Sequence, residues 1–113
     1  MQILQEGNHS AEFLLSEGPG QISREQGVLA PTAAALPSGQ VLAKNADGKF
    51  EPFDEADVAT QPAEAVLYGA VPASAVDQPI SYVARLAEVA QARLTGYTVA
   101  AKAGLASKNI IVR

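Results

Sequence analysis

Residues 36–53, LPSGQVLAKNADGKFEPF, carry the clearest signal for local structure in this chain of 113 residues. Residues 41–43, Val-Leu-Ala, alternate in the way that a strand places successive side chains on opposite faces. The four residues 45–48 have the length of a hairpin connection, and Gly48 can adopt the positive φ that such a loop needs. Pro52 has no amide to donate, so it belongs at a sheet edge or at the end of a ladder. This stretch predicts a β-hairpin.

The segments that follow the hairpin predict further strands and one helix. Residues 65–71, AVLYGAV, form a short apolar run whose length and β-branched content favour a buried strand. Residues 96–107, GYTVAAKAGLAS, predict a short helix that Gly104 weakens. The closing NIIVR predicts a strand, which Asn109 can enter with a left-handed backbone.

Residues 80–94, ISYVARLAEVAQARL, fit two structures. Alternation would suit a strand, whereas Val83, Leu86, Ala87 and Leu94 also lie at the spacing of an apolar helical stripe. Composition favours the helix, and both interpretations stay open at this point.

Residues 1–26 differ in amino-acid composition from the rest of the chain. Residues 1–26 are rich in Gly, Ser and charged side chains around one apolar island, AEFLLS at 11–16, in which alternation puts Phe13 and Leu15 on one face. The island is either an apolar contact segment within an extended arm or an edge strand of the domain. We predict a flexible N-terminal arm at 1–26 and a single domain at 27–113.

Composition limits the partners and the stability of this chain. Aromatic residues make up 5% and much of the apolar content is alanine, so the core should be thin and association with other subunits could complete it. The net charge is −4 and the eight basic residues are dispersed, which argues against a nucleic acid partner. We see no signal peptide and no apolar run of membrane-spanning length, and we expect a soluble protein made in the cytoplasm, without a membrane partner.

No group of residues points to catalysis. The sequence has no cysteine, and its single histidine, His9, lies in the polar N-terminal part. The acidic cluster of Asp54, Glu55 and Asp57 fits neither a calcium-binding loop nor a glycosidase pair. We therefore expect no catalytic residue, no metal site and no cofactor. Two classes of function remain, a structural or interaction module and a small ligand- or sugar-binding β domain, and the absence of tryptophan favours the first.

The order of several segments resembles a known family. These segments are SREQGVLA, LPSGQVLAK, DGKFEPF, AVLYGAVPASAVD, ARLAEV and NIIVR, in this order along the chain. The series resembles the bacteriophage head decoration proteins of the lambda protein D type, over about residues 10–113. Asn109 stands where a Gly is usual, and Tyr68-Gly69 is bulkier than the pattern in that family.

The resemblance implies a mainly β (α+β) domain with short helices, of the β-clip type, with residues 80–89 as strand. It implies a homotrimer at threefold or quasi-threefold sites on the outer surface of the virion's capsid, where it stabilises the shell against DNA pressure. The partner would be the major capsid protein, to which the N-terminal arm would add a strand. The capsid-binding residues would then be Glu12, Phe13, Leu14, Leu15 and Ser16. A small β-clip-type ligand- or sugar-binding module is the alternative.

Overall fold

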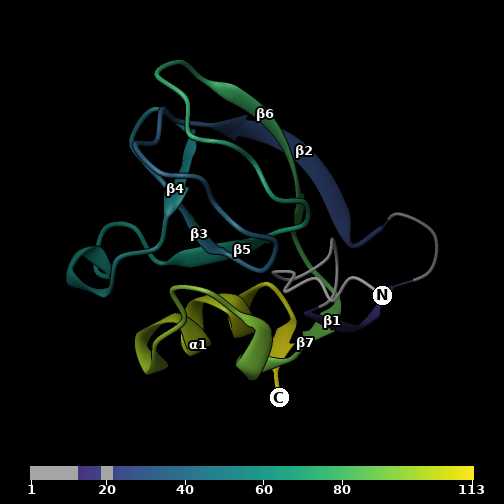
Figure 1. Cartoon of the computed structure of the whole chain (residues 1–113). Helices are drawn as coiled ribbons and strands as arrows, with labels where there is room; N and C mark the ends of the chain where they lie inside the picture. Colours follow the sequence, from purple (N-terminus) through teal and green to yellow (C-terminus); the bar gives the residue numbers. More distant parts are fainter. Residues whose placement is uncertain (1–12, 19–21) are drawn as a thin grey trace, which may run out of the picture.

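The computed structural model describes residues 13–18 and 22–113 (Figure 1). Its elements, in chain order, are β1 Leu14–Glu17, β2 Arg24–Leu29, β3 Val41–Lys44, β4 Phe50–Pro52, a 3-10 turn Glu55–Asp57, β5 Ala63–Leu67, β6 Gln78–Val83, β7 Ala87–Val89, a 3-10 turn Gln91–Arg93, α1 Val99–Ser107 and β8 Ile110–Val112. Strands predominate and α1 is the single α-helix of the described residues, so the predicted mainly β fold with short helices is confirmed.

Five strands close into a barrel in the order β2-β4-β3-β5-β6. The hairpin predicted from residues 36–53 is its β3-β4 pair, which is antiparallel, with Gly48 at φ 78° in the loop. The Asn45 side chain accepts hydrogen bonds from the backbone amides of Asp47 (2.9 Å) and Lys49 (3.1 Å), which holds the loop closed. Pro52 is the last residue of β4, as its missing amide requires.

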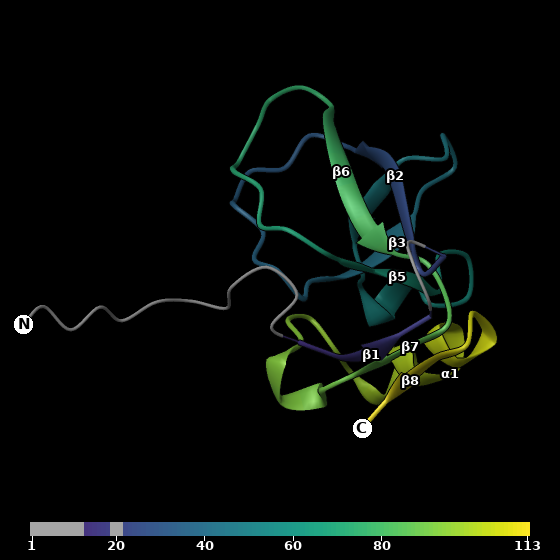
Figure 2. The same ribbon diagram turned by 90° about the vertical axis from the view of Figure 1, so that its right-hand side faces the viewer.

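A second, smaller layer lies against the barrel (Figures 1 and 2). It consists of α1 and a three-stranded sheet in the order β1-β7-β8, in which β1 is antiparallel and β8 parallel to β7. Leu42 belongs to the core inside the barrel, while its neighbours Val41 and Ala43 belong to the core shared with α1 and the small sheet. The alternation read in the sequence therefore separates two buried faces.

The segment 80–94 is not a helix. It forms the end of β6, then β7, then a 3-10 turn, so the preference that composition gave for a helix is wrong and the strand is confirmed. β6 pairs with β2 over six residue pairs, and this distant partner decides the conformation. The predicted helix α1 and the closing strand β8 are confirmed, and Asn109 enters β8 with φ 59°.

The apolar island of the N-terminal part includes an edge strand of the folded domain. Leu14–Glu17 form β1 and pair with β7, and β2 already begins at Arg24. Residues 1–12 and 19–21 of the predicted arm lie outside the described residues, so the division into arm and domain stays a prediction.

Candidate functional site

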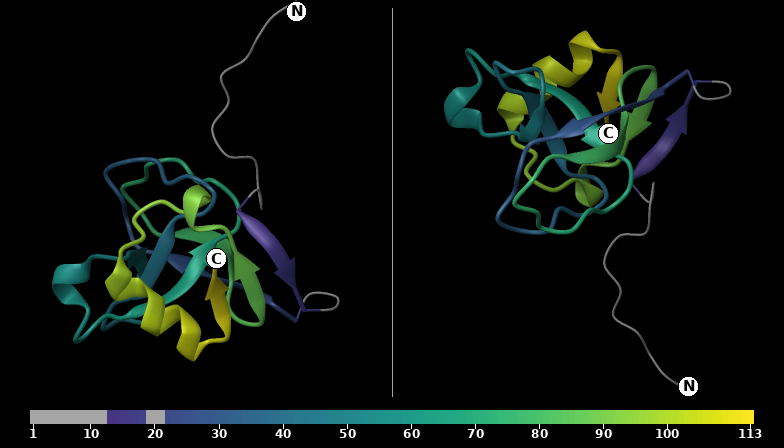
Figure 3. Two further views of the ribbon diagram at one scale, coloured as in Figure 1. Left: turned by 90° about the horizontal axis from the view of Figure 1, so that it is seen from below. Right: turned by 90° about the horizontal axis from the view of Figure 1, so that it is seen from above.

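One edge of β1 is free of any strand in the described part of the chain. The order β1-β7-β8 places β1 at the side of the small sheet, as Figure 3 shows. Its register with β7 shifts between Leu14 and Ser16, so Leu15 sits in a bulge. A free strand edge exposes backbone donors and acceptors on which a further strand can pair.

The residues predicted to bind a capsid divide into two groups. Phe13 is fully buried, and its carbonyl accepts a hydrogen bond from the amide of Ala90 at 2.8 Å. Leu14 is half-buried against the same core, whereas Leu15 is 55% exposed and Ser16 is exposed. Phe13 and Leu15 therefore do not share a face, because the bulge breaks the alternation expected from the sequence. Glu12 lies outside the described residues.

Hydrogen bonds fasten the end of β1 to the rest of the domain. The buried Ser23 hydroxyl accepts from the amide of Gly18 (2.7 Å) and donates to the carbonyl of Leu86 (2.9 Å). Arg24 pairs with Glu17 at 2.5 Å, and its guanidinium lies 4.2 Å from the centre of the Tyr68 ring. Tyr68, which departed from the family's pattern, thus supports the contact between β1 and the barrel.

The carboxylate of Glu88 lies at the centre of the outer face of the small sheet, and it is hydrogen-bonded from both neighbouring sides. Glu88 of β7 accepts hydrogen bonds from the Ser16 hydroxyl of β1 (2.8 Å) and from the Arg113 guanidinium beyond β8. The hydrogen bond from Ser16 has the largest effect, and with the one from Arg113 it lowers the pKa of the Glu88 carboxyl below its usual value. Glu88 and Ile111 are register partners, and Ile111 is exposed beside this group. No sequence signal joined Glu88, Ile111 and Arg113, because their alignment depends on the register of strands far apart in the chain.

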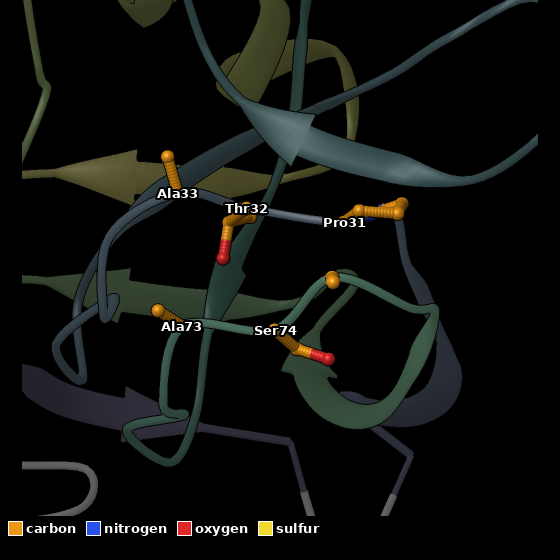
Figure 4. A pocket seen from close by; sticks show the side chains of 6 residues that line it. Pro31, Thr32, Ala33, Ala73 and Ser74 are labelled. Carbon is orange, nitrogen blue, oxygen red and sulfur yellow. The ribbon is translucent and has the colours of Figure 1, made fainter.

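A shallow hollow lies between two loops at the other end of the barrel (Figure 4). It is lined by Pro31, Thr32, Ala33, Ala73, Ser74 and Ala75. The hydroxyls of Thr32 and Ser74 already donate to the carbonyls of Ala34 (3.0 Å) and Val76 (2.9 Å). Since the lining side chains carry no charge and both hydroxyls are engaged, the hollow offers a small molecule little to recognise.

A second polar group lies on the barrel wall. The Tyr82 hydroxyl donates to Glu25 at 3.0 Å, and Arg85 pairs with the same carboxylate at 2.6 Å. Burial and the Glu25 carboxylate raise the pKa of Tyr82 to about 12, so this phenol stays protonated at neutral pH. Within residues 13–18 and 22–113, no three His, Cys, Asp or Glu side chains gather as a metal site. No helix in that part of the chain is long and apolar enough to cross a membrane.

Among residues 13–18 and 22–113, β1 thus has one edge without a strand partner, beside an outer sheet face that is partly apolar. A family model described as bacteriophage lambda head decoration protein D matches residues 3–110, nearly the whole chain. The chain belongs to this family and is a phage head decoration protein, a member of a structural rather than an enzymatic family. A search of curated proteins found no match.

Proposed function

We propose that this protein binds the outer surface of the phage head as a homotrimer at threefold or quasi-threefold sites and stabilises the shell against the pressure of packaged DNA. The observation that carries the proposal is the free edge of β1, together with membership of the decoration family. The major capsid protein is the proposed partner.

Attachment uses strand pairing at the N-terminal side of the domain. The twelve residues that precede Phe13 continue the chain from the start of β1, and with this edge they supply main-chain donors and acceptors to a strand of the capsid protein. Phe13, buried in the core, anchors the point where this segment joins the domain. Glu12 belongs to the attaching segment, while Leu15 and Ser16 face the partner.

Trimer formation multiplies a weak contact. Ordering a segment costs about 1–2 kcal/mol of backbone entropy per residue, so a single attachment should be weak. Once one subunit of a trimer is attached, the others bind at an effective concentration on the order of millimolar. Three attachments then bridge neighbouring capsid subunits, which is how a small domain can resist expansion of the shell.

A deletion of residues 1–12 tests the proposal while keeping Phe13 and β1 in place. The truncated protein should retain the thermal unfolding midpoint of the full chain, because the core side chains described above remain. Its occupancy on expanded heads of the parent phage, prepared without this protein, should fall to background in a sedimentation assay. A matched control, Glu55→Gln in the exposed 3-10 turn, should coat heads like the wild type.

Two results would contradict this function. Truncated protein that coats heads at full occupancy would show that the N-terminal segment does not attach the domain. Chemical crosslinking of protein bound to coated heads should give trimers, and heads that carry it only as monomers would remove the multivalent part of the mechanism.

A further inference from the structure

Large apolar side chains that remain exposed gather around the small sheet. Among the described residues, the exposed large apolar side chains are Leu15, Ile22, Val28, Val58, Val76, Leu86, Val99 and Ile111. Four of these, Leu15, Ile22, Leu86 and Ile111, lie on β1 or β8 or next to the Gly18 end of the sheet. We call these four residues the apolar patch.

The connections within the patch follow from contacts and register. Leu15 occupies the bulge of β1, and Ile111 is the register partner of Glu88 in β7. A methyl group placed on Gly18 would meet the side chains of both Ile22 (2.5 Å) and Leu86 (3.7 Å), so these two residues flank the same point.

Leu86 is held in a conformation that a leucine rarely adopts. Its φ is 52°, in the left-handed region that costs energy for residues with a bulky side chain. Its carbonyl accepts from the Gly18 amide (2.9 Å) and the Ser23 hydroxyl (2.9 Å), which fix the backbone there. The side chain is nevertheless 44% exposed, so the domain's own core only partly explains a leucine at this position.

The neighbouring Asn109 is an example of a residue type that commonly occupies the left-handed backbone region. Asn109 has φ 59° and its carbonyl accepts from the amide of Ala87, the residue after Leu86. Asparagine tolerates the left-handed region, and glycine does so without strain. An exposed leucine at this left-handed position costs the isolated domain stability that glycine or asparagine would not, and a contact of its side chain outside the domain would account for it.

We propose that the apolar patch packs against an apolar surface of the major capsid protein, beside the strand that pairs with β1. This inference rests on the proposed function and adds side-chain recognition to backbone pairing. The patch adjoins the edge proposed for attachment, since Leu15 belongs to β1 itself. The carboxylate of Glu88, on the central strand β7, is paired with Arg113. A partner that covers this face would therefore bury no unpaired carboxylate there.

Leu86→Gly separates a binding role from a folding role. Glycine accepts φ 52° without strain, and this gain offsets part of the entropy that glycine adds to the unfolded chain, so the variant should unfold within about 4 °C of the wild type. Affinity for expanded heads of the parent phage, prepared without this protein, should fall about tenfold because the apolar contact of one leucine is lost. Ile111→Ser should weaken binding in the same direction, with its own unfolding midpoint measured.

Two control variants match this change. Asn109→Gly relieves the left-handed backbone next to β7 but removes no apolar side chain, and it should bind like the wild type. Val76→Ser removes an apolar side chain that is 68% exposed in a loop away from the sheet, and it should also bind like the wild type.

The results distinguish this inference from the proposed function. If the wild type binds heads and Leu86→Gly binds equally well, the apolar patch is not the contact and the inference fails alone. A Leu86→Gly protein that unfolds more than about 8 °C below the wild type would make Leu86 a folding residue and would also overturn the inference. Failure of the wild type to bind heads would overturn the proposed function and the inference together.

Discussion

Gly104→Ala provides a sharp test of how α1 packs on the barrel. Gly104 lies inside α1, between the fully buried Ala101 and Leu105. A methyl group there would lie 2.4 Å from the carbonyl oxygen of Ala63 and 3.0 Å from its amide nitrogen, at the start of β5. These are backbone atoms, which cannot rotate away as a side chain could. The absence of a side chain thus allows the helix to approach the strand closely.

Two opposing effects set the magnitude. Alanine improves the helix propensity of this position by about 1 kcal/mol. Overpacking a core typically costs about 1–3 kcal/mol, and backbone on the receiving side favours the upper end. Restoring an ordinary contact near 3.4 Å from the present 2.4 Å requires α1 to move by about 1 Å, which loosens the packing of Leu105. The net loss should be about 2 kcal/mol, or a fall of about 8 °C in the unfolding midpoint.

Urea denaturation followed by circular dichroism measures this loss. Ala103→Gly, at the exposed neighbouring position, is the matched control and should lose about 1 kcal/mol through helix propensity alone. If Gly104→Ala were as stable as the wild type or more stable, propensity would outweigh the contact with Ala63, and the close approach of α1 and β5 would be refuted.

Two further predictions concern stability. Phe13→Ala should lower the free energy of unfolding by about 3–5 kcal/mol because a fully buried ring leaves a cavity, and a thermal unfolding midpoint equal to that of the wild type would exclude Phe13 from the core. Tyr82 has its pKa raised from 10.0 to about 12, so its contribution is fully present below pH 10 and is lost as the pH rises towards 12. This contribution is at most about 3 kcal/mol. Tyr82→Phe, which keeps the ring that lies 4.4 Å from Phe50, should lose stability less steeply from pH 9 to 12, and parallel curves would contradict the assignment.

The proposed attachment site could be predicted from the sequence only in part. The island at 11–16 was recognisable as an apolar segment between polar ones, and it does contain the edge strand β1. The prediction that Phe13 and Leu15 share one face was wrong. The bulge in β1 breaks the alternation, and it arises from pairing with β7, which the local sequence does not contain. Nothing in the sequence marked Leu86, since a left-handed backbone at a leucine has no local signal.

Elements that rest on local chemistry were determined by the sequence alone. The β3-β4 hairpin follows from Gly48 and the missing amide of Pro52, and the entry into β8 follows from the tolerance of Asn109 for positive φ. These backbone preferences act within a few residues, so they do not depend on which distant segments pack against them.

Only the tertiary structure decided the elements whose partners are distant. Residues 80–94 satisfy both periodicities, and pairing of β6 with β2 selects the strand. Gly104 weakens an isolated helix yet permits the contact of α1 with Ala63. In both cases the deciding free energy comes from burial and backbone pairing between segments far apart in the chain, which local patterns do not contain.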